Sequence, residues 1–392
     1  MLLPPPAMNP RVTIITLNWN GWQDTIECLE SLYDIDYNNY HIILVDNAST
    51  DESLAKIDAY CRNKRTLAPR ITQHLIRNTP TTVVHYDCDA EHVESPSSEM
   101  TRVRSNRALT VIQNGENYGF AEGNNIAVAY ALNSLHPDYV LLLNNDTVVD
   151  RRFLSALVDA AERDGQIGLV QPKILTYAAP TQNGNARDRP TFSNAKDASE
   201  KGEDQNEKKG EDGFFYADAA CVLIRNSVLF AFSGECFDPL LFAYFEDVDL
   251  SWMARLIGFK VIYCPESVCY HKLSATFGQR NPFTAHLHDR NTLRVMIKNY
   301  STRTIVFVLP LTIVLTLSRS IIASIVSLNL SEPYGFLKAL VWNSVHLRNT
   351  LARRRCIQSK RKVSDREIWS HILPFSFSVR SRLKEVWVRR HG

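Results

Sequence analysis

Five side chains in this sequence combine a reactive type with a position at the end of a strand or the start of a helix, namely Asp46, Asp146, Glu246, Asp247 and His271. A carboxylate that follows a buried strand lies where open α/β sheets bind their ligands. Carboxylate oxygens and imidazole are suitable ligands for Mg²⁺ or Mn²⁺, and a carboxylate can accept the proton of an attacking hydroxyl. A cation, a base and a polar slot for a nucleobase are the parts needed to move a sugar from a nucleotide sugar.

Each side chain fits one of these parts, and each also has a simpler explanation. Asp146 and His271 fit a site for the cation on the diphosphate. Asp247 fits the base, and Asp46 fits nucleobase recognition by accepting an N–H group. A polar turn commonly ends a strand, acidic residues commonly begin a helix, and a lone histidine is commonly structural. The presence of all the parts in one chain favours the chemical interpretation.

The elements that would position these residues alternate between strands and helices. Apolar and β-branched runs predict strands over 11–17, 40–45, 109–113, 139–143 and 167–175, and helical spacing predicts helices over 24–33, 121–132 and 151–163. Short connections between them predict parallel strands with right-handed crossovers. The loops after Leu17, Val45, Gln113 and Leu143 then meet at one edge of the sheet.

Two polar segments interrupt this rhythm. Residues 78–107 carry a short apolar piece and then no clear period, which predicts an insertion or a long loop. Residues 180–213 are almost entirely polar and charged, and such a segment buries too little surface to offset its ordering entropy, so we expect it to be disordered. Neither insertion has a role that follows from its residues.

The C-terminal part indicates a membrane partner. A basic amphipathic helix is expected over 284–300, and the apolar stretch 305–330 contains Arg319. Its uninterrupted part, 305–317, is shorter than the roughly 20 residues of a membrane span, so we expect helices in or dipping into the interface, although a span or a buried helix pair stays open. The tail 351–392 has 12 Lys or Arg and 3 Asp or Glu, whereas the whole chain has a net charge of +2. Such a tail favours an anionic membrane surface over nucleic acid, because it adjoins apolar sequence.

Cysteine usage and the first residues bear on the compartment. The eight cysteines form no CxxC pair, and several stand in apolar context, which favours buried, reduced thiols in a cytosolic protein. The sequence begins MLLPPPAMNP, which lacks the pattern of a signal peptide. We therefore expect the protein at the cytoplasmic face of the cell membrane, held peripherally or at the interface.

The ordered set of motifs resembles a known family. The stretches are VTIITLNWNGWQDTIECLESL, ILVDNASTDES, NGENYGFAEGNNIA, YVLLLNNDTVVD, FAYFEDVDLSWMARLIGFKV and HKLSAT. In this order they are similar to family 2 glycosyltransferases with a GT-A fold, of the rhamnosyltransferase-like kind. Later, DRNTLRVMIKN resembles the helix that follows the catalytic domain in that family.

The resemblance implies an activity and a set of site residues. It implies inverting transfer of a sugar, by metal-assisted single displacement, from a UDP-, dTDP- or GDP-sugar to a hydroxyl of a glycan or lipid-linked acceptor. Asp247 would be the base with Glu246 supporting it, and Asp146, with His271, would hold Mg²⁺ or Mn²⁺. The residues that would bind the nucleotide are Thr16, Leu17, Asn18, Asp46, Asn117, Gly119, Asn124 and Asn145.

The implied fold class is α/β, with a mostly parallel Rossmann-like sheet flanked by helices and C-terminal membrane-associated helices. Residues 1–283 would form the catalytic domain, 284–350 the membrane-associated helices and 351–392 the basic tail.

Departures from the family pattern keep a second function open. Asn144 stands where the family's DXD motif has its first carboxylate, and ADAA at 217–220 replaces a glycine-rich segment. A catalytically inactive partner subunit that binds nucleotide sugars is therefore the alternative. A dinucleotide-dependent oxidoreductase is disfavoured, because NWNGW after the first strand lacks a GxGxxG turn.

Overall fold

The computed structural model describes residues 9–64, 70–77, 79–86, 109–183, 215–272, 282–327 and 331–371. The chain divides into two compact units. The first, here the sheet unit, comprises Met1–Gly184, Asp218–Phe242 and Cys264–Leu273, and the second, the helical unit, comprises Asn185–Ala217, Ala243–Tyr263 and Ser274–Gly392. Each unit is described by itself.

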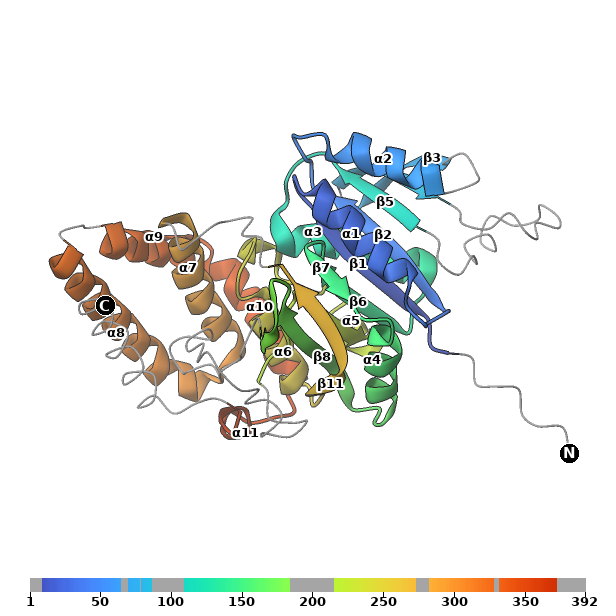
Figure 1. Ribbon diagram of the computed structural model, residues 1–392. Coiled ribbons are helices and arrows are strands. Elements are labelled where there is room, and N and C mark those ends of the chain that lie inside the picture. Colours follow the sequence, from blue (N-terminus) through green and yellow to red (C-terminus); the bar gives the residue numbers. More distant parts are fainter. Residues whose placement is uncertain are drawn as a thin grey trace, which may run out of the picture. The chain divides into compact units, whose positions relative to one another are not determined.

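Four parallel strands form the centre of the sheet, in the order β5, β2, β1, β6 (Figure 1). They are β1 (Val12–Asn18), β2 (Tyr40–Asp46), β5 (Leu109–Asn114) and β6 (Tyr139–Asn144). Their register sets Asn18 beside Asp46, and Leu17 beside Asn144. The carboxyl ends of the strands therefore reach one edge together, as the sequence predicts.

Antiparallel strands flank this centre on both sides. They are β3 (Arg70–Ile76) and β4 (Thr79–Tyr86) next to β5, and β10 (Cys221–Arg225), β8 (Ile167–Thr176), β9 (Ala179–Asn183), β11 (Lys260–His271) and β7 (Thr147–Val149) beyond β6. The expectation of a mostly parallel sheet therefore holds only for the four central strands. The prediction of a loop from residue 78 is wrong for β4, whose partner β5 satisfies its backbone groups. The rest of that insertion, 87–107, lies outside the described residues.

The helices of the sheet unit follow the predicted alternation. They are α1 (Trp22–Tyr33), α2 (Ser53–Lys64), α3 (Gly119–Tyr130) continued by the π-helix η1 (Ala131–Leu135), α4 (Phe153–Glu162), α5 (Asn226–Ala231) and the 3-10 helix η2 (Pro239–Leu241). The apolar faces of α1 and α4 are buried, and β1, β2 and β6 are buried along almost their whole length. Strands that are buried on both faces need the uninterrupted apolar runs that these segments have.

The structure places part of the second polar insertion in a strand and shows the environment of the described cysteines. The expectation of disorder is wrong for residues 180–183, which belong to β9 and pair with β8, and the remainder of the 180–213 insertion lies outside the described residues. The described cysteines form no disulfide among themselves, and all are buried except Cys356, which is exposed. Burial raises the pKa of the Cys28 thiol to about 12, so this thiol is unreactive at neutral pH.

One histidine in the core makes stability sensitive to acid. His41 is buried in β2 beside the Thr110 hydroxyl, with 2.8 Å between Nε2 and Oγ1. Burial lowers the pKa of His41 to about 3, and the charges of Arg11 and His85 add to this effect. In the unfolded chain histidine titrates near 6.5, so the unfolded state binds the extra proton between these two values. The stability that His41 contributes is complete above pH 6.5 and declines as the pH falls toward 3.

We expect the free energy of unfolding to fall by about 1.4 kcal/mol per pH unit below pH 6.5 through this group alone. Urea unfolding between pH 7 and 5 measures how the free energy of unfolding changes with pH. The slope should be smaller in His41→Gln by the contribution of one proton. His74→Gln, at a solvent-exposed position in β3, is the matched control. An unchanged slope in His41→Gln would show that another group accounts for the acid sensitivity.

The helical unit is built around α7 (Figure 1). Its helices are α6 (Glu246–Leu256), α7 (Pro282–Asn299), α8 (Thr302–Ser327), α9 (Ser331–Val345), α10 (Leu347–Lys360) and α11 (Asp365–Trp369). The helices expected over 284–300 and 305–330 are thus present as α7 and α8. The tail beyond residue 371 lies outside the described residues, and the three predicted domains stay a prediction.

Among the described residues, one helix is long and apolar enough to cross a membrane, at Thr302–Ile322 with a mean hydropathy of 2.2. In the sequence, the uninterrupted apolar part, 305–317, is too short for a span, and only the inclusion of Arg319 makes the stretch long enough. The structure shows instead that α8 runs without a break through Pro310 and Arg319 for 26 residues.

Candidate active site

Asn18, the last residue of β1, ties three strand ends together. Its Nδ2 donates to Asp46 Oδ1 at 2.8 Å and to Ser49 Oγ at 3.0 Å, in the loop after β2. Its Oδ1 accepts from Thr25 Oγ1 at 2.9 Å, and Thr25 in turn accepts from Asn145 Nδ2 at 2.9 Å, in the loop after β6. The structure therefore brings the predicted residues Asn18, Asp46 and Asn145 into one network.

Asp46 orders its own loop. Its carboxylate accepts from Ser49 Oγ at 2.6 Å and from Ser49 N at 3.0 Å, besides the bond from Asn18. The side chain is almost fully buried. Both carboxylate oxygens are thus already engaged within the loop, and recognition of a nucleobase by Asp46 stays a prediction.

Asn47 is a central residue of the site that the sequence prediction missed. Its Nδ2 donates to Asn117 Oδ1 at 2.8 Å and to the Gly119 carbonyl at 3.1 Å. Its Oδ1 accepts from Asn114 Nδ2 at 3.0 Å and from Tyr118 N at 3.3 Å. Asn47 therefore joins the end of β2 to the end of β5 and the start of α3. Its place directly after Asp46, at the end of a buried strand, was the signal available in the sequence.

Gly119 permits the close approach of two segments. Its φ is +74°, and a Cβ at this position would overlap the ring of Phe242. The Phe242 carbonyl accepts from Ala121 N at 3.0 Å, so the loop at Phe242 lies directly on the first turn of α3. This contact explains why the segment around 119 requires glycine.

The other predicted nucleotide residues lie deeper. Thr16 is fully buried within β1, and its hydroxyl has no hydrogen-bond partner among the described residues. Leu17 packs against Gly123 of α3. Asn124 donates through Nδ2 to the Phe120 carbonyl of its own helix at 2.8 Å. Their contact with a nucleotide stays a prediction.

Asp146 and His271 meet although 125 residues separate them. β7 pairs antiparallel with the end of β11, which sets His271 opposite Thr147. As a result His271 Nε2 lies 3.0 Å from Asp146 Oδ1, and both side chains are 11% exposed. Lys272 N also donates to the Asp146 carbonyl at 2.9 Å.

This pair fits the predicted divalent cation as two of its ligands. A carboxylate oxygen and an imidazole nitrogen, 3.0 Å apart, are donor atoms that would suit Mg²⁺ or Mn²⁺. Within the described residues no group of three or more His, Cys, Asp or Glu side chains could hold a metal. Among the described residues, Asp146 and His271 therefore form a pair of candidate ligands and not a complete metal site.

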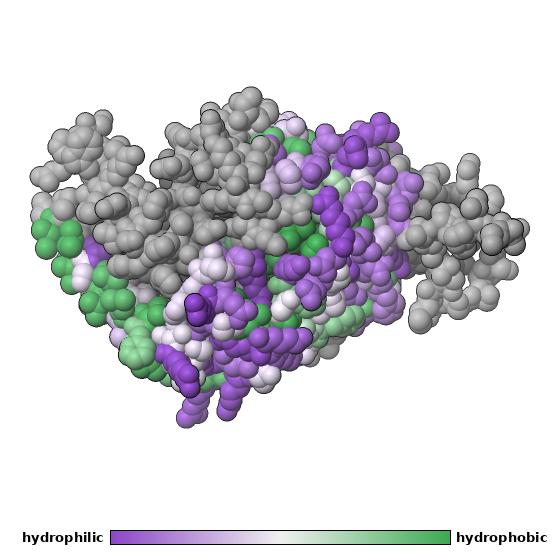
Figure 2. Space-filling view, turned by 90° about the horizontal axis from the view of Figure 1, so that it is seen from below, coloured by the Kyte–Doolittle hydropathy of each residue, from purple (hydrophilic) through white to green (hydrophobic). Residues whose placement is uncertain are grey.

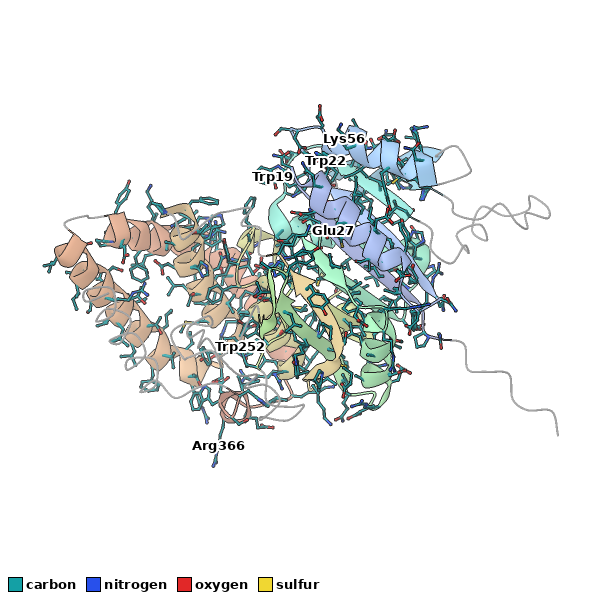
Figure 3. The ribbon with its side chains drawn as sticks, in the orientation of Figure 1. Trp19, Trp22, Glu27, Lys56, Trp252 and Arg366 are labelled. Atoms are coloured by element: carbon teal, nitrogen blue, oxygen red, sulfur yellow. The ribbon has the colours of Figure 1, made fainter. Side chains whose placement is uncertain are left out.

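A lysine that forms ion pairs with two carboxylates follows His271 directly in the chain. Lys272 Nζ is 2.6 Å from Asp24 Oδ1 and also contacts Glu27 of α1, which is labelled in Figure 3. Tyr177 donates its hydroxyl to Glu27 at 2.6 Å. Burial would lower the pKa of Lys272, but its hydrogen bonds to the two carboxylates outweigh this and raise it. The lysine therefore stays charged and fixes the chain next to His271 against α1.

Glu246 and Asp247 begin α6 in the helical unit, and both are buried. Asp247 Oδ1 accepts from Val248 N at 2.8 Å. The two residues before them, Tyr244 and Phe245, have φ angles of 70° and 69°. A non-glycine residue in this region costs about 1–3 kcal/mol and occurs most often at functional sites.

α7 holds this strained loop in place. Asn291 Nδ2 donates to the carbonyls of Ala243 at 2.9 Å and Tyr244 at 2.8 Å. The His288 ring lies over the Tyr244 ring, with 4.5 Å between centroids. Asn291 belongs to the DRNTLRVMIKN stretch, so the sequence indicated the helix but not this role.

A buried ion pair joins α6 to α7. Lys298 Nζ lies 2.5 Å from Asp249 Oδ2, and Asn299 Nδ2 donates to Asp249 Oδ1 at 2.8 Å. Both charged side chains are 1% exposed. Next to them Trp252 (Figure 3) packs edge-on against Tyr300, with 4.6 Å between ring centroids. These contacts fix the helix that carries Glu246 and Asp247.

Comparison with known proteins gives consistent matches. A family model described as Glycosyltransferase like family 2 matches residues 55–292, and one described as Glycosyl transferase family 2 matches residues 13–73. A low-salt glycan biosynthesis hexosyltransferase of Haloferax volcanii is 24% identical over 174 residues, which cover 43% of this chain and 54% of that protein. The chain thus spans about half the length of the curated relative it matches.

Two solved structures are similar to the chain, and the one with a TM-score above 0.5 shows the fold. GalNAc-T7 with UDP, GalNAc and Mn²⁺ is 15% identical with a TM-score of 0.51, over 74% of this chain and 48% of that one. A mannosyltransferase from Pyrobaculum calidifontis in complex with GDP-Man and Mn²⁺ is 14% identical with a TM-score of 0.48, over 91% and 88%. The expected GT-A fold is confirmed, whereas rhamnosyl specificity stays a prediction.

Proposed function

Because the chain belongs to the glycosyltransferase-like family 2, we propose that it transfers a hexose from a nucleotide-diphospho-sugar to a hydroxyl of a glycan or lipid-linked acceptor. The observation that carries this proposal is the contact of Asp146 with His271 beside the strand-end network of Asn18 and Asp46. The candidate site for a cation would therefore lie next to the polar loops at the strand ends of the sheet unit.

Asp146 and His271 would hold Mg²⁺ or Mn²⁺ through Oδ1 and Nε2. The bound cation would neutralise the charge that develops on the leaving diphosphate. The structures of similar fold that contain Mn²⁺ support a divalent cation. Since Asn144 and Asn145 carry no carboxylate, Asp146 is the only anionic ligand in its turn.

The loops after β1, β2 and β5 would bind the nucleotide. Asn18 and Asn47 hold these loops in a fixed arrangement through buried hydrogen bonds. These hydrogen bonds involve three of the predicted nucleotide-binding residues, namely Asp46, Asn117 and Gly119. The donor would be a UDP-, dTDP- or GDP-sugar, and the similar structure of GalNAc-T7, which contains UDP, supports a nucleoside diphosphate in this site.

Asp247 would act as the base, with Glu246 supporting it. The acceptor hydroxyl loses its proton to the Asp247 carboxylate as its oxygen bonds to the anomeric carbon. The bond from that carbon to the diphosphate oxygen breaks, and the nucleoside diphosphate leaves with the electron pair. This single displacement inverts the anomeric centre.

A donor screen tests the function. With Mn²⁺, the protein should hydrolyse or transfer at least one of a panel of UDP-, dTDP- and GDP-sugars, and EDTA should abolish this activity. Binding of a nucleotide in calorimetry, without turnover of any donor, would instead identify an inactive partner subunit. No binding and no turnover would contradict both functions.

Removing a metal ligand should change the metal requirement. We expect Asp146→Asn and His271→Ala each to raise the Mn²⁺ concentration for half-maximal activity by about 10- to 100-fold, because each removes one of two protein ligands. Asp159→Asn, at an exposed position of α4, is the matched control. An unchanged Mn²⁺ requirement in both variants would contradict the proposed metal site.

We also propose that the protein works at the cytoplasmic face of the cell membrane. The apolar helix α8 and the basic C-terminal sequence support this location. A lipid-linked acceptor would be available there.

A further inference from the structure

The polarity of α8 is the reverse of that of a helix in a soluble protein. A helix on the surface of a soluble domain buries its apolar side chains and exposes its polar ones. In α8 the buried side chains include the hydroxyl residues Thr312, Ser320 and Ser324. The exposed side chains include large apolar ones, namely Val306, Phe307, Leu311, Val314, Ile321, Ile322 and Ile325. Small hydroxyl residues toward protein and large apolar residues outward are typical of helices that contact lipid.

α9 and the start of α10 continue the same pattern. Asn343 and Thr350 are buried, whereas Tyr334, Leu337, Val341, Val345, Leu347 and Leu351 are among the exposed residues. Together, the exposed apolar residues that this paragraph and the previous one name on α8, α9 and α10 are called the apolar face. Figure 2 shows hydrophobic side chains gathered at the left of the view, where α8 lies in Figure 1. An exposed apolar surface that extends over several helices marks a binding surface.

The charge around the apolar face matches an anionic membrane. From 302 to 362 the sequence has ten Lys or Arg residues and a single acidic residue, Glu332. Arg303, Lys338 and Arg348 are exposed on the helices that carry the apolar face. Basic residues beside an apolar helix face bind interfaces with anionic lipids.

The packing of α8 shows that it returns along α7. α8 begins at Thr302, three residues after the end of α7, and Arg319 of α8 lies 3.9 Å from Asp289 near the middle of α7. The first residues of α9 then lie beside the first half of α7, where His286 Nδ1 is 3.2 Å from the Gly335 carbonyl.

A bilayer crossing by α8 is incompatible with this packing. α9 would begin on the far side of the membrane, and α7 would have to accompany α8 across it. Yet α7 carries buried Arg294 and Lys298, which form polar contacts with α10 and α6. Charged residues of this kind are costly in hydrocarbon.

We propose that the apolar face of α8, α9 and α10 inserts into one leaflet of an anionic membrane, so that the protein is monotopic and α8 does not span the bilayer. Only the purpose of the docking rests on the proposed function. That purpose is to bring the active site to a lipid-linked acceptor. Docking itself requires no catalysis.

Vesicle binding by the full chain tests the apolar face. The double variant Phe307→Glu/Ile322→Glu should bind vesicles of phosphatidylcholine and phosphatidylglycerol, mixed three to one, at least about 100-fold more weakly than the wild type. Phe307 is 75% exposed, so the change leaves the folded core intact, which thermal unfolding checks. Phe230→Glu is the matched control, since Phe230 is 62% exposed on α5 of the sheet unit.

Accessibility to a membrane-impermeant thiol reagent tests the monotopic arrangement. In a Cys88→Ser/Cys356→Ser background, Glu332→Cys at the start of α9 and Asp159→Cys on α4 should react from the same side of sealed membrane vesicles. Reaction of Glu332→Cys only after the vesicles are dissolved would show that α8 crosses the bilayer and would overturn the proposal.

Two further outcomes would also overturn it. One is vesicle binding by Phe307→Glu/Ile322→Glu as strong as that of the wild type. The other is self-association of the chain, lost in this variant, without any binding of vesicles, which would assign the face to a second copy. Failure of the proposed catalytic function is separate, because Asp247→Asn should bind vesicles like the wild type.

Discussion

Replacing Asp247 by Asn is expected to slow sugar transfer by about 10²- to 10⁴-fold, with little change in donor affinity. Asparagine has the shape of aspartate but cannot accept the proton of the acceptor hydroxyl. Its Oδ1 can still accept the hydrogen bond from Val248 N, so the first turn of α6 is preserved. Initial rates over a range of donor concentrations, together with calorimetric donor affinity, measure the two effects separately.

The controls distinguish a base from a structural residue. Asp159→Asn makes the same chemical change at an exposed position and should keep the full rate. Thermal unfolding of Asp247→Asn should match that of the wild type, since a purely structural role would lower the melting temperature along with the rate. A transfer rate in Asp247→Asn equal to that of the wild type would refute its role as base.

Replacing Lys298 by Met is expected to lower the free energy of unfolding by about 3–5 kcal/mol. The substitution leaves the Asp249 carboxylate buried at 1% exposure without its cation. Asn299 still donates to that carboxylate, but a single neutral donor does not replace a buried ammonium. Denaturant unfolding followed by tryptophan fluorescence measures the loss, because Trp252 lies on the same helix.

The double variant Asp249→Leu/Lys298→Met identifies the cause. It removes both charges, and apolar side chains of similar size in place of a buried pair are often neutral or stabilising. Much of the lost stability should therefore return. Lys56→Met is the matched control, since the pair of Lys56 with Glu52 is exposed and such pairs contribute little. Equal losses in Lys298→Met and Lys56→Met would refute the importance of burial.

The ion pair also bears on activity. It fixes α6, whose first two residues are Glu246 and Asp247, and Asn291 of α7 holds the strained loop that precedes them. Since the strain at Tyr244 and Phe245 is maintained by α7, damage to the α6–α7 contact should disorder the base before the whole unit unfolds.

The sequence by itself determined the centre of the sheet and the side chains at its edge. Runs such as YHIILV and YVLLL are apolar along their whole length, and this pattern requires strands buried on both faces. Because each run ends abruptly in Asp or Asn, parallel pairing alone places Asn18, Asp46 and Asn144 at one edge. These are local signals, and tertiary packing does not change them.

Only the tertiary structure decided how distant residues meet. The contact of Asp146 with His271 depends on the antiparallel pairing of β7 with β11, which no local period encodes. Asn47 became central because its amide reaches β5 and α3 at once. Likewise, the reversed polarity of α8 appears only when the packing shows that Thr312 and Ser320 are the buried side. Periodicity fixes which residues share a face, whereas the direction of that face, and the pairing of segments far apart in the chain, depend on which packing of all the elements has the lowest free energy.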